Sequence, residues 1–444
     1  MIKYINYGGA DGVTGACHML NTEFGNILLD CGLFQGRDRK IYSNLEMYFD
    51  PREVDAVVLS HAHIDHCGRI PILYEMGYRG KVYGTEATKL LSEIVLEESS
   101  KIFEEFSGES YKLFNLENVQ MFLDNYVKVD YGKTTKILDN VFIELFDAGH
   151  LLGSASILVK IKDKSVFYSG DIGKLNTPIL KDPEKITGAD YAIIESTYGS
   201  LEKHESNEFF DEFKNIIINT LKRGGKCIIP SSTVGKMQEI LYLINDIFEE
   251  NDLKYKVYID SPMSSKVVDI YEKCKYLYDE DAQEKLNNGD NPLDFTNLNY
   301  IITKEESIEI QENEEPYVVL SAGGMCEGGR VIYHLRKQID NPKNSIILVG
   351  NQVHGTLGCR LSKGSKEIKI FKDKFKVKAE IYNFPSLSGH GDRNTIVDYV
   401  CSMNKKPKKI FLVHGDRKNQ MDLRENLNFK NVEYTKFLKR YELK

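Results

Sequence analysis

The chain has 444 residues, of which 41% are hydrophobic and 28% charged, as is ordinary for a globular protein. Its net charge of −8 argues against a broad cationic face for nucleic acid, so a phosphate-bearing substrate would have to be held locally, by metal ions and a small basic groove. The apolar runs are far too short to cross a bilayer and the N-terminus lacks a signal-peptide pattern, so we expect a cytoplasmic protein with no membrane partner.

The first 200 or so residues consist of short strand-like runs bounded by Gly, Asn and Asp. Strands are expected at 25–32, 55–62, 81–85, 142–149, 165–171 and 191–197. One long helical stretch, at 87–106, interrupts them.

From about residue 205, helices alternate with strands. The expected helices are 207–224 and 235–251, and the expected strands are 226–231, 256–262, 317–324 and 345–351. This alternation predicts a parallel α/β sheet. In the segment 366–381, apolar residues alternate with lysines, which fits a hairpin with one solvated face; a phosphate-contacting groove wall is the alternative. After about residue 380 the chain again shows the pattern of the first 200 or so residues, which indicates one domain interrupted by another.

Eight cysteines are scattered along the chain without a C-x-x-C pair. This spacing suits neither a disulfide framework nor a cysteine-based zinc site. We expect most of them to be buried thiols in a reducing compartment.

The segment 60–68, SHAHIDHCG, holds three of the ten histidines. His61 and His63 follow an apolar strand two residues apart, so they share one face of extended chain. Asp65 and His66 come where the chain curls, so the two pairs can point to two neighbouring places. Imidazole and carboxylate together suit zinc and a two-metal hydrolytic site. A chance cluster of surface histidines is the alternative.

Other polar residues each follow an apolar strand: His150, Asp171, Glu195, His390 and His414. Residues at the carboxyl ends of strands converge on one edge in layered α/β folds, where sites are built. One such histidine alone would more often be a satisfied core or capping residue. Five of them beside the H-x-H-x-D-H loop favour a single site.

Six motifs occur in this order: SHAHIDHCGRIP, GHLLGSAS, SGDIG, ESTYG, SLSGHGD and LVHGD. Together they resemble the metallo-β-lactamase-fold nucleases that carry a β-CASP domain, a family that includes the cleavage-and-polyadenylation endonuclease and compact bacterial and archaeal ribonucleases. H-x-H-x-D-H alone identifies only the superfamily, whereas ESTYG, SGHGD and VHGD are specific to the β-CASP group. The resemblance covers essentially the whole chain, and we expect a compact member of the family, without an N-terminal RNA-binding extension or an added C-terminal domain.

The fold that this resemblance implies is an αββα metallo-β-lactamase sandwich with an inserted parallel α/β β-CASP domain. We expect the first part of the sandwich at 1–204, the insertion at 205–380 and the rest of the sandwich at 381–444.

The resemblance also implies that seven side chains bind two Zn²⁺ ions. They are His61, His63 and His150 for one ion, Asp65, His66 and His414 for the other, and Asp171 as a bridge. Water between two such metals becomes a hydroxide nucleophile near neutral pH. Asp30 would orient a ligand histidine from outside the metal site. His204 would support the site in the same way or lie at a domain junction.

By the same resemblance, Glu195 pairs with His390, which would protonate the departing 3′ oxygen as general acid. A structural carboxylate at a helix end is the alternative for Glu195. Arg330 and Arg360 lie in glycine-containing segments and are candidates for contacts to the nucleic-acid backbone; turn-forming glycines explain these segments equally well.

The expected activity is zinc-dependent hydrolysis of single-stranded RNA, by internal cleavage. Single-stranded DNA is a second substrate to consider, and a homodimer is compatible with the resemblance. Two alternatives are a small-molecule hydrolase of the lactonase or thioesterase type and an inactive scaffold subunit of an RNA-processing complex. The retained metal ligands weigh against the scaffold, and the acid pair and the insertion weigh against the small-molecule hydrolase.

Overall fold

The computed structural model describes residues 1–107, 113–202, 208–350, 352–353, 355–385 and 387–444. The chain forms two compact units, one made of Met1–Lys203 with His390–Lys444 and the other of His204–Gly389. The domain boundaries given above remain predictions. No helix in the described part of the chain combines the length and the apolar character needed to cross a membrane.

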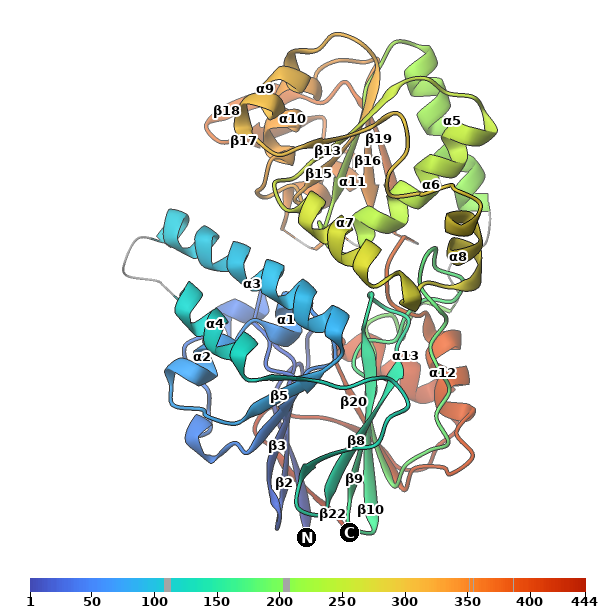
Figure 1. Cartoon of the computed structure of the whole chain (residues 1–444). Helices are drawn as coiled ribbons and strands as arrows, with labels where there is room; N and C mark the ends of the chain where they lie inside the picture. The colour runs from blue at the N-terminus through green and yellow to red at the C-terminus, as the bar shows by residue number, and fades with distance from the viewer. Residues whose placement is uncertain (108–112, 203–207, 351, 354, 386) are drawn as a thin grey trace. The chain divides into compact units, whose positions relative to one another are not determined.

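The first sheet of the first unit has seven strands in the order β22-β1-β2-β3-β4-β5-β6 (Figure 1). The strands are β1 (Ile2–Gly8), β2 (Cys17–Thr22), β3 (Gly25–Leu29), β4 (Ala56–Val58), β5 (Lys81–Gly84), β6 (Tyr126–Lys128) and β22 (Arg440–Leu443). Strands β3 to β6 run parallel, and the other pairs are antiparallel. Strands β1 and β22 pair with Ile2 opposite Leu443, which places the two ends of the chain side by side.

The second sheet also has seven strands, in the order β21-β20-β11-β10-β9-β8-β7. They are β7 (Thr135–Leu138), β8 (Val141–Asp147), β9 (Ala155–Ile161), β10 (Lys164–Tyr168), β11 (Tyr191–Glu195), β20 (Lys409–Val413) and β21 (Val432–Tyr434). Strand β20 lies between β11 and β21 and runs parallel to both.

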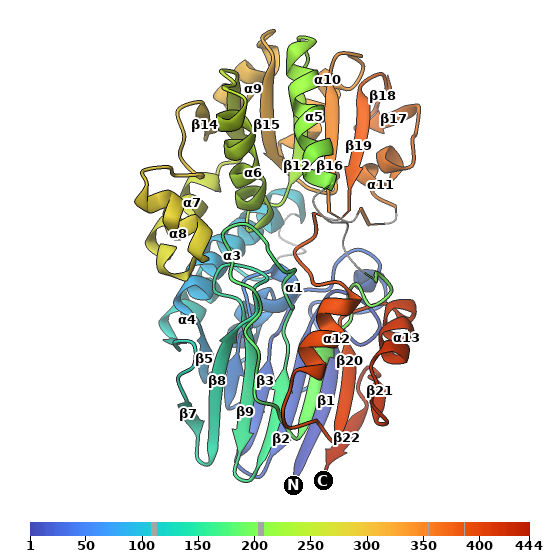
Figure 2. The same ribbon diagram turned by 90° about the vertical axis from the view of Figure 1, so that its right-hand side faces the viewer.

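Alternating residues of the two sheets meet in a shared core, as the period of two in a strand requires. In β8, for example, Val141, Ile143 and Leu145 all point into this core. Outside the first sheet lie α1 (Ile64–Cys67), α2 (Ile70–Glu75), α3 (Glu86–Ser107) and α4 (Leu116–Asp124), and outside the second lie α12 (Arg393–Cys401) and α13 (Arg417–Asn426) (Figures 1 and 2). The predicted αββα sandwich is confirmed.

The second unit is built on a parallel sheet of six strands in the order β14-β13-β15-β12-β16-β19. They are β12 (Cys227–Ser231), β13 (Lys256–Asp260), β14 (Leu298–Ile301), β15 (Tyr317–Ala322), β16 (Ser345–Val349) and β19 (Glu380–Phe384). The central strands β12, β15 and β16 are almost wholly buried, as expected for a parallel sheet covered on both faces. The predicted parallel α/β insertion is confirmed.

Helices cover both faces of this sheet. Helices α5 (Glu208–Lys222) and α6 (Lys236–Glu250) lie on one face, and α9 (Lys304–Glu312), α10 (Val331–Gln338) and α11 (Leu357–Ser362) on the other (Figure 1). Two further helices are α7 (Ser264–Lys273) and α8 (Glu280–Asn287). Strands β17 (Glu367–Ile370) and β18 (Asp373–Lys376) form the predicted antiparallel hairpin. All eight cysteines are free thiols, and seven of them are buried.

Candidate metal centre

The first unit gathers the predicted ligands where several of its strands end. His61 and His63 lie in the loop between β4 and α1, and His63 is the residue that precedes the first turn of α1. Asp65 and His66 lie in that turn. The remaining ligands come from loops that follow β8, β10 and β20: His150, Asp171 and His414.

Four nitrogen and oxygen atoms face one another in the first group. His63 Nδ1 lies 3.1 Å from His61 Nε2 and 3.1 Å from His150 Nε2. Asp171 Oδ2 lies 3.4 Å from His61 Nε2 and 3.6 Å from His150 Nε2. Among the described residues, they form one of three groups whose ligand atoms could hold a metal ion.

A second group lies directly beside the first. His66 Nε2 is 3.2 Å from His414 Nε2, which is 3.6 Å from Asp65 Oδ2. Asp171 Oδ2 is 3.3 Å from His66 Nε2, so this one oxygen lies close to nitrogens of both groups. A third group combines Asp171 and His414 with Glu195.

The spacing of these atoms fits a bound ion. Four ligands held tetrahedrally at 2.0–2.1 Å from an ion lie about 3.3 Å apart, and the facing atoms of the first group are 3.1–3.6 Å apart. Asp171 Oδ1 is buried and, in the described part of the chain, accepts no hydrogen bond. A buried carboxylate oxygen without a donor is costly, and a cation would satisfy it.

Asp30, at the end of β3, fixes the orientation of His66. Its buried carboxylate accepts hydrogen bonds from the Ser60 amide (2.7 Å), Ser60 Oγ (2.7 Å), Tyr168 OH (2.7 Å) and His66 Nδ1 (2.8 Å). Because His66 donates from Nδ1, its Nε2 is left as the atom that faces the ligand group. Asp30 has a left-handed backbone with φ of 58°, which is uncommon for a residue other than glycine and is typical of functional sites.

Two hydroxyl groups set the tautomers of two other histidines. Ser60 Oγ gives its only proton to Asp30, so His61 Nδ1, 3.0 Å away, must donate to Ser60. Thr197 Oγ1 donates to the carbonyl of His414, so His414 Nδ1, also 3.0 Å away, must donate to Thr197. Both imidazoles therefore present Nε2 to the ligand groups, as metal-binding histidines do when the other nitrogen is anchored.

Opposite charges control ionisation in this buried centre. Burial favours neutral His66, but the carboxylates of Asp171 and Asp30 outweigh burial and hold its pKa well above the usual value. Burial likewise opposes ionisation of Asp171, yet the surrounding histidines hold its pKa well below the usual value. The carboxylates thus attract positive charge, which protons on imidazole or a metal ion can supply.

Glu195 and His390 lie at the edge of the same centre. Glu195 is wholly buried at the end of β11, and its Oε1 accepts from the Ile172 amide at 2.7 Å and from His390 Nδ1 at 3.2 Å. Burial lowers the pKa of His390, but Glu195 and Asp171 reverse this and raise it to about 9. The side chain of His390 keeps 18% of its surface exposed, so it is the member of the pair that solvent reaches.

Two of the remaining predicted residues, Arg330 and Arg360, belong to the second unit. Arg330 donates to Asp260 Oδ1 at 2.7 Å and to two backbone carbonyls within the second unit. Arg360 lies in α11 with its side chain 49% exposed, and it donates to the Gly355 carbonyl. His204 is outside the described residues. The substrate contacts of Arg330 and Arg360 and the supporting role of His204 stay predictions.

The sequence analysis missed three residues that support the ligands: Ser60, Tyr168 and Thr197. Ser60 and Thr197 lie inside the motifs SHAHIDHCGRIP and ESTYG, which could have identified them. Tyr168 ends an ordinary apolar strand, so nothing in the sequence signals its contact with Asp30.

Comparison with known proteins supports the same architecture. Residues 19–190 match the family described as metallo-beta-lactamase superfamily domain, 237–361 the Beta-Casp domain and 374–436 the Zn-dependent metallo-hydrolase RNA specificity domain. Ribonuclease TTHA0252 of Thermus thermophilus is 33% identical over 432 residues, which cover 97% of each chain. The chain belongs to the β-CASP family of metallo-β-lactamase-fold nucleases.

Two further relatives of this β-CASP protein come from Methanocaldococcus jannaschii. An RNase J-like protein is 32% identical, with 93% of this chain and 92% of the relative covered. Transcription termination factor FttA is 31% identical, with 96% and 69% covered. A solved structure of a protein of unknown function from Enterococcus faecalis shares the fold alone, with 12% identity and a TM-score of 0.58 over both whole chains. The predicted family is confirmed; its fold implies metal binding, and the clustered histidines and aspartates are the candidate ligands.

Proposed function

We propose that this β-CASP protein is a zinc-dependent ribonuclease that cleaves single-stranded RNA internally. The observation that carries the proposal is the double ligand group around Asp171, with the Glu195–His390 pair at its edge. The names of the relatives, a ribonuclease and an RNase J-like protein, support RNA as substrate. The cytoplasm remains the proposed compartment, and a homodimer the proposed alternative to a monomer.

The donor atoms favour zinc. Imidazole nitrogens with a carboxylate oxygen suit Zn²⁺, whereas Mg²⁺ and Ca²⁺ prefer sites made of oxygen alone. We assign His61, His63 and His150 to one ion and Asp65, His66 and His414 to the other, with Asp171 between them. When bound, the ions supply Lewis acidity toward a phosphate group and lower the pKa of water for attack on phosphorus.

His390 is the residue placed to move a proton to the leaving group. Glu195 accepts from its Nδ1, and we assign the transfer of the proton to Nε2, the other ring nitrogen. The amide of Ile172 and the amide of Thr197 hold the Glu195 carboxylate from the other sides, at 2.7 and 3.2 Å. The pair therefore has a fixed orientation, which general acid catalysis requires.

A small-molecule hydrolase is the second candidate, since the H-x-H-x-D-H loop occurs in such enzymes too. The Glu195–His390 pair and the inserted second unit weigh against it, because the resemblance ties both features to the nucleases of the β-CASP group. An inactive scaffold is disfavoured because every predicted ligand is present and lies in a ligand group.

The test is cleavage of end-labelled single-stranded RNA and single-stranded DNA by the zinc-loaded protein, with the products mapped by size. We expect internal cuts in RNA, and loss of cleavage in Asp65→Ala. Asp163→Ala, which removes an exposed carboxylate, is the matched control and should cleave normally. Full activity of Asp65→Ala would refute the two-metal assignment, and cleavage of a fluorescent lactone or thioester without RNA cleavage would favour the second candidate.

A further inference from the structure

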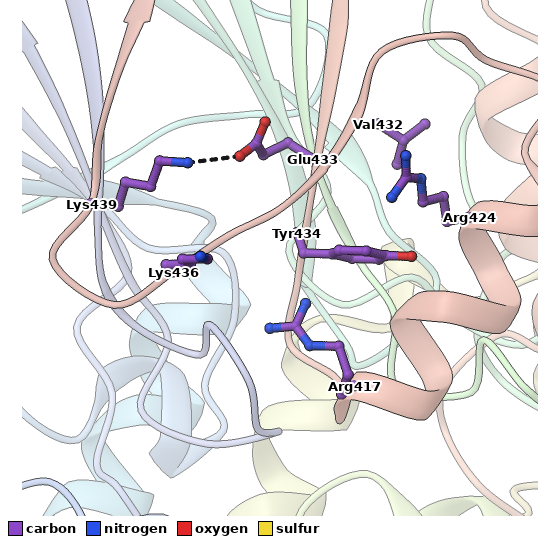
Figure 3. Close-up of a pocket in the computed structure, with 7 residues that line it drawn as sticks. All are labelled: Arg417, Arg424, Val432, Glu433, Tyr434, Lys436 and Lys439. Carbon is purple, nitrogen blue, oxygen red and sulfur yellow. Dashed lines mark hydrogen bonds and ion pairs between the residues drawn. The ribbon is translucent and has the colours of Figure 1, made fainter.

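A basic pocket lies in the first unit, and none of the residues assigned to the metals lines it. It has a volume of about 380 Å³ and lies between α13, strand β21 and the loop that follows β21 (Figure 3). Its lining residues are Arg417, Arg424, Val432, Glu433, Tyr434, Lys436 and Lys439.

The charge of this pocket is opposite to that of the chain. Four lining residues are basic and one is acidic, whereas the whole chain carries −8. The single carboxylate, Glu433, is already neutralised, because Lys439 Nζ and Lys409 Nζ each lie 2.9 Å from it. In the part of the chain that the structure describes, neither Arg424 nor Lys436 forms an ion pair, and both are exposed. Two cations are thus available to an anionic ligand.

Tyr434 holds two of the basic groups in place. The guanidinium carbons of Arg417 and Arg424 lie 4.8 and 4.9 Å from the centre of its ring. Figure 3 shows the two guanidinium groups on opposite sides of the ring. A guanidinium stacked on an aromatic face keeps its N–H groups at its edge, where they can bind phosphate oxygens in pairs. Because both faces of the ring are occupied, the pocket suits phosphate groups and not stacked bases.

The pocket is linked to the metal centre through one strand. Strand β20 ends directly before His414, and α13 begins three residues after that histidine. Strand β21 pairs with β20 along Ile410, Phe411 and Leu412 and forms the edge of the sheet. Both the pocket and His414 are therefore held by neighbouring elements of one sheet.

We propose that this pocket binds backbone phosphates of the single-stranded RNA substrate at a site separate from the metal centre. The proposal rests on the proposed function for the identity of the polyanion. The pocket gives an acidic protein a local cationic contact, which adds affinity for RNA that does not depend on the base sequence.

The test compares RNA binding by Arg424→Gln/Lys436→Gln and by the wild type. The control, Lys133→Gln/Lys185→Gln, removes two exposed positive charges elsewhere in the first unit; Lys133 lies beside β7, at the opposite edge of the same sheet. Fluorescence anisotropy with a labelled single-stranded RNA is measured in EDTA over a range of salt concentrations, so binding is scored without metal-dependent cleavage.

We expect the slope of log affinity against log salt to fall by about 1.4 for the pocket variant, since each phosphate contact contributes about 0.7 for single strands. The loss of affinity should therefore be about sevenfold greater at 50 mM than at 200 mM salt. Hydrolysis of a small chromogenic phosphodiester by the zinc-loaded variant should match that of the wild type. The control should keep the wild-type slope.

The proposal is overturned if the pocket variant binds RNA with wild-type affinity and slope, or if the control loses as much. It is also overturned if the wild-type protein does not bind RNA. Tight binding in EDTA without cleavage in zinc would overturn the proposed function and leave the pocket assignment standing.

Discussion

Replacing Asp30 by Asn tests whether the carboxylate behind His66 sets the metal affinity. The two side chains have the same shape, so the buried space stays filled. Asp30 accepts one donor, the Ser60 amide, at Oδ1 and three donors at Oδ2. An Asn side chain has only one acceptor oxygen, so its NH₂ group must face at least one of these donors.

The expected loss of affinity for zinc can be estimated from this mismatch between donors and acceptors. In the less costly orientation the amide oxygen keeps the three donors, but His66 Nδ1 then donates to a neutral group. Loss of a charged partner costs about 1.5–3 kcal/mol. Substitution of residues that anchor metal ligands weakens metal binding by roughly 10- to 100-fold, or about 1.4–2.8 kcal/mol. The two estimates agree, and we expect a 10- to 100-fold weaker affinity for zinc.

Zinc affinity is measured by competition with a chromophoric chelator, with circular dichroism to verify the fold. Tyr168→Phe is the matched comparison, because it removes one of the four donors and leaves the carboxylate in place. We expect its effect to be less than about tenfold, since one neutral hydrogen bond is worth about 1 kcal/mol. Wild-type zinc affinity in a folded Asp30→Asn protein would refute the role given to Asp30.

Three other changes give separate tests. His390→Ala should lower the rate of RNA cleavage by roughly 10²- to 10⁴-fold with no loss of bound zinc; zinc lost together with activity would make His390 a ligand. Burial raises the pKa of Asp147 from 3.8 to about 7, with Lys181 opposing and Glu184 reinforcing the shift. Because the folded protein then holds this proton more tightly than the unfolded chain, the free energy of unfolding should fall as pH rises from about 4 to 7, by as much as roughly 4 kcal/mol. Asp147→Asn keeps the acceptor for the Gly149 amide and should raise the melting temperature more at pH 8 than at pH 5; parallel stability curves for the two proteins would contradict this. Asp260→Ala should lower the free energy of unfolding by about 3–5 kcal/mol, because it leaves Arg330 and buried His334 without their carboxylate. The control Asp340→Ala, at an exposed position, should change it little in chemical denaturation. Equal midpoints for the two variants would show that the buried network contributes no stability.

The parts of the site that sequence could predict are those governed by local spacing. His61 and His63, two residues apart on extended chain, do place nitrogens within 3.1 Å of each other. The other ligands follow strands, and the order of strands in the sheets then brings His150, Asp171 and His414 together. Each of these positions follows from the rule that polar residues at strand ends meet at one edge.

The parts that sequence could not predict depend on packing between distant elements. Tyr168 reaches Asp30 across 138 positions because β10 and β3 belong to two sheets that share one core. Arg330 lies in a glycine-containing segment that suggested a ligand contact, yet its charge meets Asp260, 70 residues earlier in the chain. The basic pocket joins a helix to an edge strand, and the net charge of −8 had argued against a broad cationic face but not against a small one.

The position of β20 also sets the order in which the proposed metal site is completed. During translation the ribosome makes His61, His63, Asp65, His66, His150 and Asp171 early, then the whole second unit, and only afterwards His390 and His414. A nascent chain that ends before residue 409 lacks the last ligand, and it also lacks the strand between β11 and β21. The proposed ligand set is thus incomplete for most of synthesis, and it is completed only when the last strands of the first unit have been made.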